Sequence, residues 1–150
     1  MSNLMDGRAI AKLTMGMKAT KTALANATAV YFRAYTGLVV VTAIIGKVTV
    51  EAVGATTLTI THVPTAGATI PVCAAGDVDT GTIGSYITCP LSGTGAATTN
   101  DAATGLAIPS KMLLPVGALT FTWSASSGSA SWTVWYIPME DGAYMAAATA

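Results

Sequence analysis

The sequence predicts an all-β fold, an antiparallel β-sandwich of the jelly-roll kind that follows an N-terminal arm. From residue 29 onward, apolar residues alternate with threonine and other polar residues at a period of two, the spacing of a half-buried strand. These segments are short and end at Gly- or Pro-rich turns. No helical pattern lies between them, which favours a sandwich, with a closed β-barrel as the alternative.

The expected arm covers residues 1–28, and one β-sandwich domain covers residues 29–150. Within the arm, apolar residues recur loosely at helical spacing, and Arg8 and Lys12 stand four positions apart. Gly7 and Gly16 interrupt this pattern. We therefore expect an extended or partly helical arm that becomes ordered against a partner.

The body contains seven or eight short candidate strands. Their alternation is clearest where the apolar Leu58 and Ile60 share a face with His62, between threonines. Gly or Pro ends most of the runs. The expected strands are residues 29–35, 38–45, 47–52, 57–63, 69–73, 82–89, 119–125 and 130–137, and residues 112–114 lead into the last two.

The clearest pairing is expected near the C-terminus. Residues 119–125 and 130–137 both alternate, and the Ser-Ser-Gly-Ser segment between them is typical of a hairpin turn. Trp135 and Ile137 make the second face of the later strand apolar too, so we expect that strand to be covered on both sides.

Residues 91–104 form a low-complexity stretch of small residues that lacks large apolar anchors. This composition predicts a mobile loop that offers small polar contacts.

The charge pattern indicates association. Only 9% of the residues are charged against 52% hydrophobic, and the formal net charge is zero. Such a surface repels neighbours weakly, so we expect other subunits to cover much of it. Residues 1–50 hold six of the seven bases and one acid, whereas residues 51–150 hold six of the seven acids. A basic arm on an acidic body is suited to binding a neighbouring copy or an acidic partner.

No motif predicts catalysis, a metal or a cofactor. His62 is the only histidine, and no nucleophile elbow accompanies it, so we interpret it as a strand-end or core residue. Asp79-Thr80-Gly81 matches the short aspartic-protease signature but lacks the preceding apolar pair, which favours an acidic turn. A calcium loop starting at Asp77 fails at its glycine and closing glutamate positions. We expect a protein that is not an enzyme.

The sequence also bears on compartment and on nucleic acid. Its longest apolar run has nine residues, about half the length of a membrane-spanning helix, and lysines interrupt any apolar core that a leader peptide would need. Aromatic residues surround Arg33, as in proteins that bind single-stranded nucleic acid. A pI near 6.5, however, argues against a protein whose main role is to bind nucleic acid.

The two cysteines, Cys73 and Cys89, match the spacing of neither a zinc ribbon nor a redox pair. They are either two buried thiols or a disulfide.

Four segments resemble the small structural proteins of tailed bacteriophages: residues 37–50, 56–60, 114–121 and 130–143. The similarity extends over about residues 30–145. It implies a capsid decoration, or cement, protein that is made in the host cytoplasm and sits as a homo-oligomer, dimer or trimer, on the outer surface of the virion. Its partner would be the major capsid protein, whose subunits it bridges, and neither nucleic acid nor membrane would be bound.

On this interpretation the arm and its exit hold the capsid contacts. Basic side chains there are expected to meet acidic groups of the shell. The candidate contact residues are Arg8, Lys12, Lys18, Lys21, Tyr31 and Arg33. The alternative function is a phage tail, fibre or receptor-binding domain, in which the aromatic hairpin and residues 91–104 form a carbohydrate-binding surface.

Overall fold

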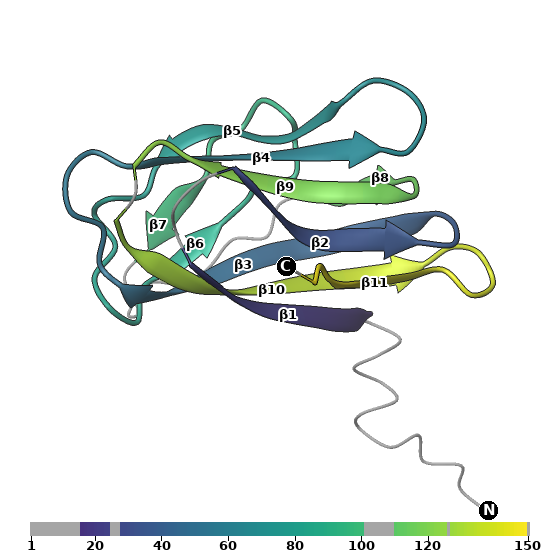
Figure 1. Cartoon of the computed structure of the whole chain (residues 1–150), viewed down its shortest axis with the longest axis horizontal. Helices are drawn as coiled ribbons and strands as arrows, with labels where there is room; N and C mark the ends of the chain where they lie inside the picture. The colour runs from purple at the N-terminus through teal and green to yellow at the C-terminus, as the bar shows by residue number, and fades with distance from the viewer. Residues whose placement is uncertain (1–15, 25–27, 101–109, 126, 150) are drawn as a thin grey trace, which may run out of the picture.

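Two antiparallel sheets pack face to face in the computed structural model, which describes residues 16–24, 28–100, 110–125 and 127–149 (Figure 1). The described residues form strands and no helix, as the alternation predicted. Sheet A has the order β1 (Met17–Leu24), β10 (Ser129–Pro138), β3 (Val39–Val50), β6 (Tyr86–Thr88) and β7 (Thr98–Asn100), with β8 (Met112–Leu114) also paired to β3. Sheet B has the order β11 (Tyr144–Ala147), β2 (Ala29–Tyr35), β9 (Gly117–Trp123), β4 (Thr57–Pro64) and β5 (Ile70–Asp77).

Most connections carry the chain from one sheet to the other. Only β4 to β5, β6 to β7 and β7 to β8 join strands of the same sheet. Strands that are neighbours in the sequence therefore usually face each other across the core. The two sheets cannot separate without breaking contacts along the whole chain, because neither sheet is built from one continuous stretch of sequence.

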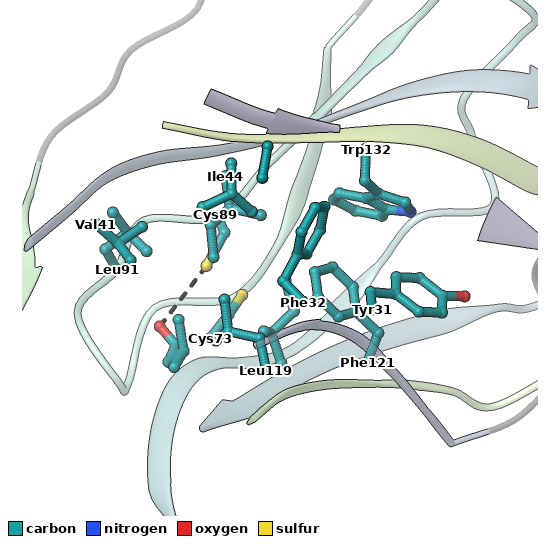
Figure 2. Close-up of a cluster of buried hydrophobic side chains, with 14 of the residues drawn as sticks. Tyr31, Phe32, Val41, Ile44, Cys73, Cys89, Leu91, Leu119, Phe121 and Trp132 are labelled. Carbon is teal, nitrogen blue, oxygen red and sulfur yellow. Dashed lines mark hydrogen bonds between the residues drawn. The ribbon is translucent and has the colours of Figure 1, made fainter. Parts of the chain in front are cut away.

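The core lies between the sheets and is rich in aromatic rings (Figure 2). Phe121 of β9 and Trp132 of β10 meet across the sandwich with ring centroids 4.8 Å apart in an edge-on arrangement. Tyr31 of β2 stacks on Phe121 at 4.4 Å. The inward positions predicted for these strands are confirmed, since Leu119, Phe121, Trp123, Trp132, Val134 and Tyr136 are all buried.

The predicted hairpin is wrong. β9 pairs with β2 and β4 in sheet B, whereas β10 pairs with β1 and β3 in sheet A. The chain therefore crosses from sheet B to sheet A between β9 and β10 instead of pairing these two strands in a hairpin. Alternation shows which side chains point inward, but it is the same whether two consecutive strands pair in one sheet or face each other from opposite sheets. Here the large inward rings of β9 and β10 pack against each other across the sandwich.

The two strands expected at residues 38–45 and 47–52 form a single strand, β3. β3 runs without a break through Gly46, where a separation was expected. A Cβ at this position would lie 2.8 Å from the Trp132 ring. Gly46 therefore makes room for the indole within a continuous strand rather than ending the strand.

Part of the segment predicted as an arm is a strand of the sandwich. Residues 17–24 form β1, which pairs along its whole length with β10 at the edge of sheet A. The loose helical spacing of this segment was misleading, because its small and polar residues also alternate as an edge strand requires. Ala19 is on the buried side of that strand. Residues 1–15 and 25–27 lie outside the described residues, so an extended or partly helical arm before β1 stays a prediction.

The predicted loop at residues 91–104 is confirmed for residues 91–95, which form no helix or strand, but not for residues 98–100. Leu91 is buried, and residues 98–100 form β7 against β6. The Ala74 amide donates to the Gly95 carbonyl at 2.9 Å, so the backbone of β5 holds this stretch although its side chains are small. Residues 101–104 lie outside the described residues. β11, which the sequence did not predict, completes sheet B beside β2.

Candidate partner-binding surface

The four candidate contact residues that the structure describes do not lie on one surface. Arg8 and Lys12 lie outside the described residues. Lys18 is exposed on the outer face of sheet A, and Arg33 is exposed on the outer face of sheet B. The thickness of the sandwich thus separates these two side chains.

Tyr31 is part of the core and not a surface contact. Its side chain is 2% exposed, and its hydroxyl accepts a hydrogen bond from the Trp123 indole nitrogen at 3.2 Å. Burial raises the pKa of Tyr31, and the Trp123 hydrogen bond opposes that rise. A shift in register at β2 turns both Tyr31 and Phe32 inward, which simple alternation does not predict.

Lys21 has a structural role. Its Nζ donates to the Ala148 carbonyl at 2.8 Å and to the Val30 carbonyl at 3.5 Å, and it lies 5.7 Å from the centre of the Tyr31 ring. The side chain therefore connects β1 of sheet A with the end of the chain beside sheet B. Lys21 thus links the two sheets along the side of the sandwich where β1 and β11 lie.

We expect Lys21→Met to lower the free energy of unfolding by about 1.5 kcal/mol, because it removes charge-assisted hydrogen bonds from partly buried carbonyls. Lys18→Met on the same strand is the matched control and should cost less than about 1 kcal/mol, since Lys18 makes one exposed contact with the Trp135 ring. Urea unfolding followed by circular dichroism measures both. Equal losses would contradict the structural role of Lys21.

The outer face of sheet A carries an apolar row. Ile137 of β10, Val40 of β3 and Leu113 of β8 are cross-strand neighbours, and Leu113 is 53% exposed. Trp135 continues the row along β10, with the Lys18 Nζ 5.8 Å from its ring centre. Two outward-facing apolar residues, Trp135 and Ile137, were the signal in the sequence for this row.

The charged side chains on the strands of this sheet are all positive, whereas Glu140, which follows β10, accepts a hydrogen bond from the Leu38 amide at 3.1 Å. The strands of sheet A contain Lys18, Lys21 and Lys47 and no aspartate or glutamate. Lys111 precedes β8 and is exposed. Lys18, Lys47 and Lys111 thus border an apolar sheet face without carboxylates on its strands, an arrangement that fits an apolar protein surface bearing acidic groups. We call this face the sheet A surface.

His62 lies in the core, as expected. It is fully buried on β4, and neither ring nitrogen makes a hydrogen bond of normal geometry to a described residue. Burial lowers the pKa of His62, and the nearby Pro115 carbonyl opposes this in part. The side chain acts as a packing residue that stays neutral, which is not the arrangement of a base oriented by a carboxylate.

We expect this histidine to make the fold sensitive to mild acid. Because its pKa is lowered in the folded state, the unfolded chain binds a proton more readily. Above about pH 6.5 His62 is neutral in both the folded and the unfolded chain, and the free energy of unfolding does not depend on its titration. Below that pH the free energy of unfolding decreases, by at most about 1.4 kcal/mol per pH unit. Urea midpoints between pH 7.5 and pH 5 test this, and His62→Met should flatten the profile; an unchanged slope would contradict it.

Asp79 lies in the turn after β5, as the sequence suggested. The Asp79 amide donates to Asp77 Oδ1 at 3.1 Å, and the hydrogen bond with the Asp77 carboxyl raises the pKa of Asp79. The interacting carboxyls are two positions apart in one exposed turn, unlike the two separate Asp-Thr-Gly loops of an aspartic protease. Within the described ranges no group of three or more His, Cys, Asp or Glu side chains is placed to hold a metal ion.

Comparison with protein-family models, curated proteins and solved structures found no match to the chain. In the part of the chain that the structure describes, no helix is long and apolar enough to cross a membrane. The physical features of the sheet A surface are therefore the basis for assigning a function.

Proposed function

We propose that the protein is a non-enzymatic structural protein of a bacteriophage virion, which decorates the outer surface of the capsid and bridges major capsid subunits. The observation that carries the proposal is the sheet A surface, an apolar row with lysines around it on a rigid sandwich. A surface of this kind suits permanent attachment to another protein more than catalysis.

We also propose that the sandwich is a jelly roll. If β11 is set aside and β6 to β8 count as one unit, sheet A reads β1, β10, β3 and β6, and sheet B reads β2, β9, β4 and β5. This order, with repeated crossing between the sheets, is that of two interlocked Greek keys. Jelly rolls occur in viral capsid proteins, which supports the proposal by analogy of fold only.

The occupant of the sheet A surface is proposed to be the major capsid protein. Its contact patch should be apolar and should carry carboxylates opposite Lys18, Lys47 and Lys111. Individual contacts need only modest affinity, because symmetric copies attach to the shell at many points. The basic residues Arg8 and Lys12 would add further contacts from before β1.

The receptor-binding alternative gains no support from the described core. It requires exposed aromatic rings in the region of residues 119–137, but Phe121, Trp123 and Trp132 are buried and the expected hairpin does not form. Only Trp135 of this aromatic set lies on an outer face, next to Lys18. A single half-buried ring does not make a carbohydrate platform.

Density-gradient co-sedimentation tests the proposal. Capsid shells prepared without this chain are mixed with increasing amounts of the purified protein, and the bound copies per shell are counted. We expect saturation at a fixed number compatible with the symmetry of the shell, and weaker binding at higher salt because lysines contribute. Failure to bind, or binding without saturation, would overturn the proposed attachment.

A further inference from the structure

The two cysteines lie in opposite sheets and are both buried. Cys73 is in β5, the edge strand of sheet B, and is 0% exposed. Cys89 follows directly after β6 of sheet A and is 4% exposed. Figure 2 shows the two sulfur atoms among the packed core side chains between the sheets, and both thiols are free in this structure.

The local contacts bring the two side chains together. The Cys89 thiol donates to the Val72 carbonyl at 3.7 Å, and this carbonyl belongs to the peptide that precedes Cys73. Cys73 Sγ lies 3.4 Å from the Ala74 carbonyl. The neighbouring Cys89 thiol lowers the pKa of Cys73, and the Cys73 thiol together with burial raises the pKa of Cys89. The two thiols are thus direct neighbours across the sandwich.

We propose that Cys73 and Cys89 form an oxidative modification site, at which a disulfide compound of the glutathione class converts them into an intrachain disulfide between the sheets. The inference rests on the position of the two side chains and is independent of the partner proposed for the sheet A surface. The disulfide would join β5, which pairs with only β4 among the sandwich strands, to the strand region around β6 in the opposite sheet.

The exchange is balanced. The Cys73 thiolate attacks one sulfur of oxidised glutathione, forms a mixed disulfide and releases one glutathione thiolate. The Cys89 thiolate then attacks the Cys73 sulfur and releases the second. The protons of the two cysteines pass to the two released glutathiones. One oxidised glutathione is thereby reduced as the protein dithiol is oxidised.

Access controls the rate of this reaction. Neither sulfur is reachable in the closed sandwich, so the oxidant must enter when the edge strand β5 opens locally. Once formed, the disulfide closes a loop of about 15 residues, which restricts the unfolded chain. We therefore expect the oxidised protein to melt about 5–10 °C above the reduced protein.

Intact-mass measurement on the full chain tests the proposal. The folded protein is incubated with oxidised glutathione or with a phosphine reductant, then denatured and treated with a thiol-alkylating reagent. We expect the oxidised sample to lose about 2 Da, to take up no alkyl group and to remain a monomer on a non-reducing gel. Peptide mapping should show one crosslinked pair containing residues 73 and 89.

Cys89→Ala provides the matched control, because it keeps the attacking thiol and removes the resolving one. We expect it to stop at a glutathione adduct on Cys73. Two alkylated thiols in the wild-type protein after exposure to the oxidant, stable glutathione adducts on both cysteines, or a disulfide-linked dimer would each overturn the proposal. These readouts need no capsid, so a negative result here is distinct from a failure of the proposed function.

Discussion

Trp132→Ala is expected to lower the free energy of unfolding by about 3–5 kcal/mol, the largest effect of any single substitution considered. Trp132 is fully buried, and its ring contacts Phe121 and Trp123 edge-on at centroid distances of 4.8 and 6.2 Å. It also fills the space that Gly46 leaves open. Removal of the indole therefore leaves a cavity that joins both sheets, and surrounding side chains from two sheets cannot easily close it.

The outward tryptophan of the same strand is the control for this prediction. Trp135→Ala removes the same side chain from the half-buried outer face of β10 and should change stability by less than about 1 kcal/mol. Urea unfolding of the two variants gives the comparison. Similar losses for Trp132→Ala and Trp135→Ala would show that the inward and outward assignment of β10 is wrong.

Trp135→Ala is expected instead to weaken attachment to capsid shells by at least about 30-fold, the effect of losing a central aromatic contact from an interface. The ring lies beside the row of Ile137, Val40 and Leu113 and under the Lys18 ammonium group. Its loss would remove both apolar area and the group that positions Lys18. Co-sedimentation with shells at a series of protein concentrations measures the change.

Tyr144→Ala supplies the matched aromatic control for attachment. Tyr144 of β11 is 44% exposed on the outer face of sheet B, where it stacks on Tyr35 with ring centroids 5.0 Å apart. We expect this variant to bind shells as the wild-type protein does. Loss of binding with Tyr144→Ala and retention with Trp135→Ala would place the contact on sheet B and contradict the proposed surface.

The positions of most strands could be predicted from the sequence, whereas their partners could not. Alternation is a local property, so the inward positions of Leu119, Phe121 and Trp132 follow from their neighbours along the chain. Pairing depends on contacts between distant segments. The stretch between β9 and β10 contains turn residues that suit a hairpin, but the chain uses it to cross between sheets.

Three of the missed strands, β1, β7 and β11, share a related reason. β1 and β7 are edge strands that consist mainly of small and polar residues, and β11 is an edge strand of only four residues, so these strands bury few large side chains and leave little pattern. They are held by backbone hydrogen bonds to stronger neighbours. Lys21 illustrates the limit, because a lysine in a basic stretch gives no sign that its ammonium group bonds to the Ala148 carbonyl just after β11 of the opposite sheet.

The candidate surface was only partly predictable. The sequence showed that Trp135 and Ile137 are apolar residues on the second face of their strand, and its basic N-terminal segment indicated Lys18 as a contact residue. It did not indicate that Lys18 and Trp135 are cross-strand partners, or that Val40 and Leu113 continue the same row. Those relations depend on the register of β1, β3, β8 and β10, which is fixed by the whole sandwich rather than by any one segment.

The most direct test of the capsid-decoration account is a cryo-electron microscopy map of shells saturated with the protein, compared with a map of shells without it. The account predicts added density on the outer surface, over junctions between major capsid subunits, with the sheet A surface against the shell and the outer face of sheet B toward solvent. Density with the two sheets in the opposite orientation would contradict the assigned surface, and saturated shells without added density at defined positions would contradict the proposed function itself.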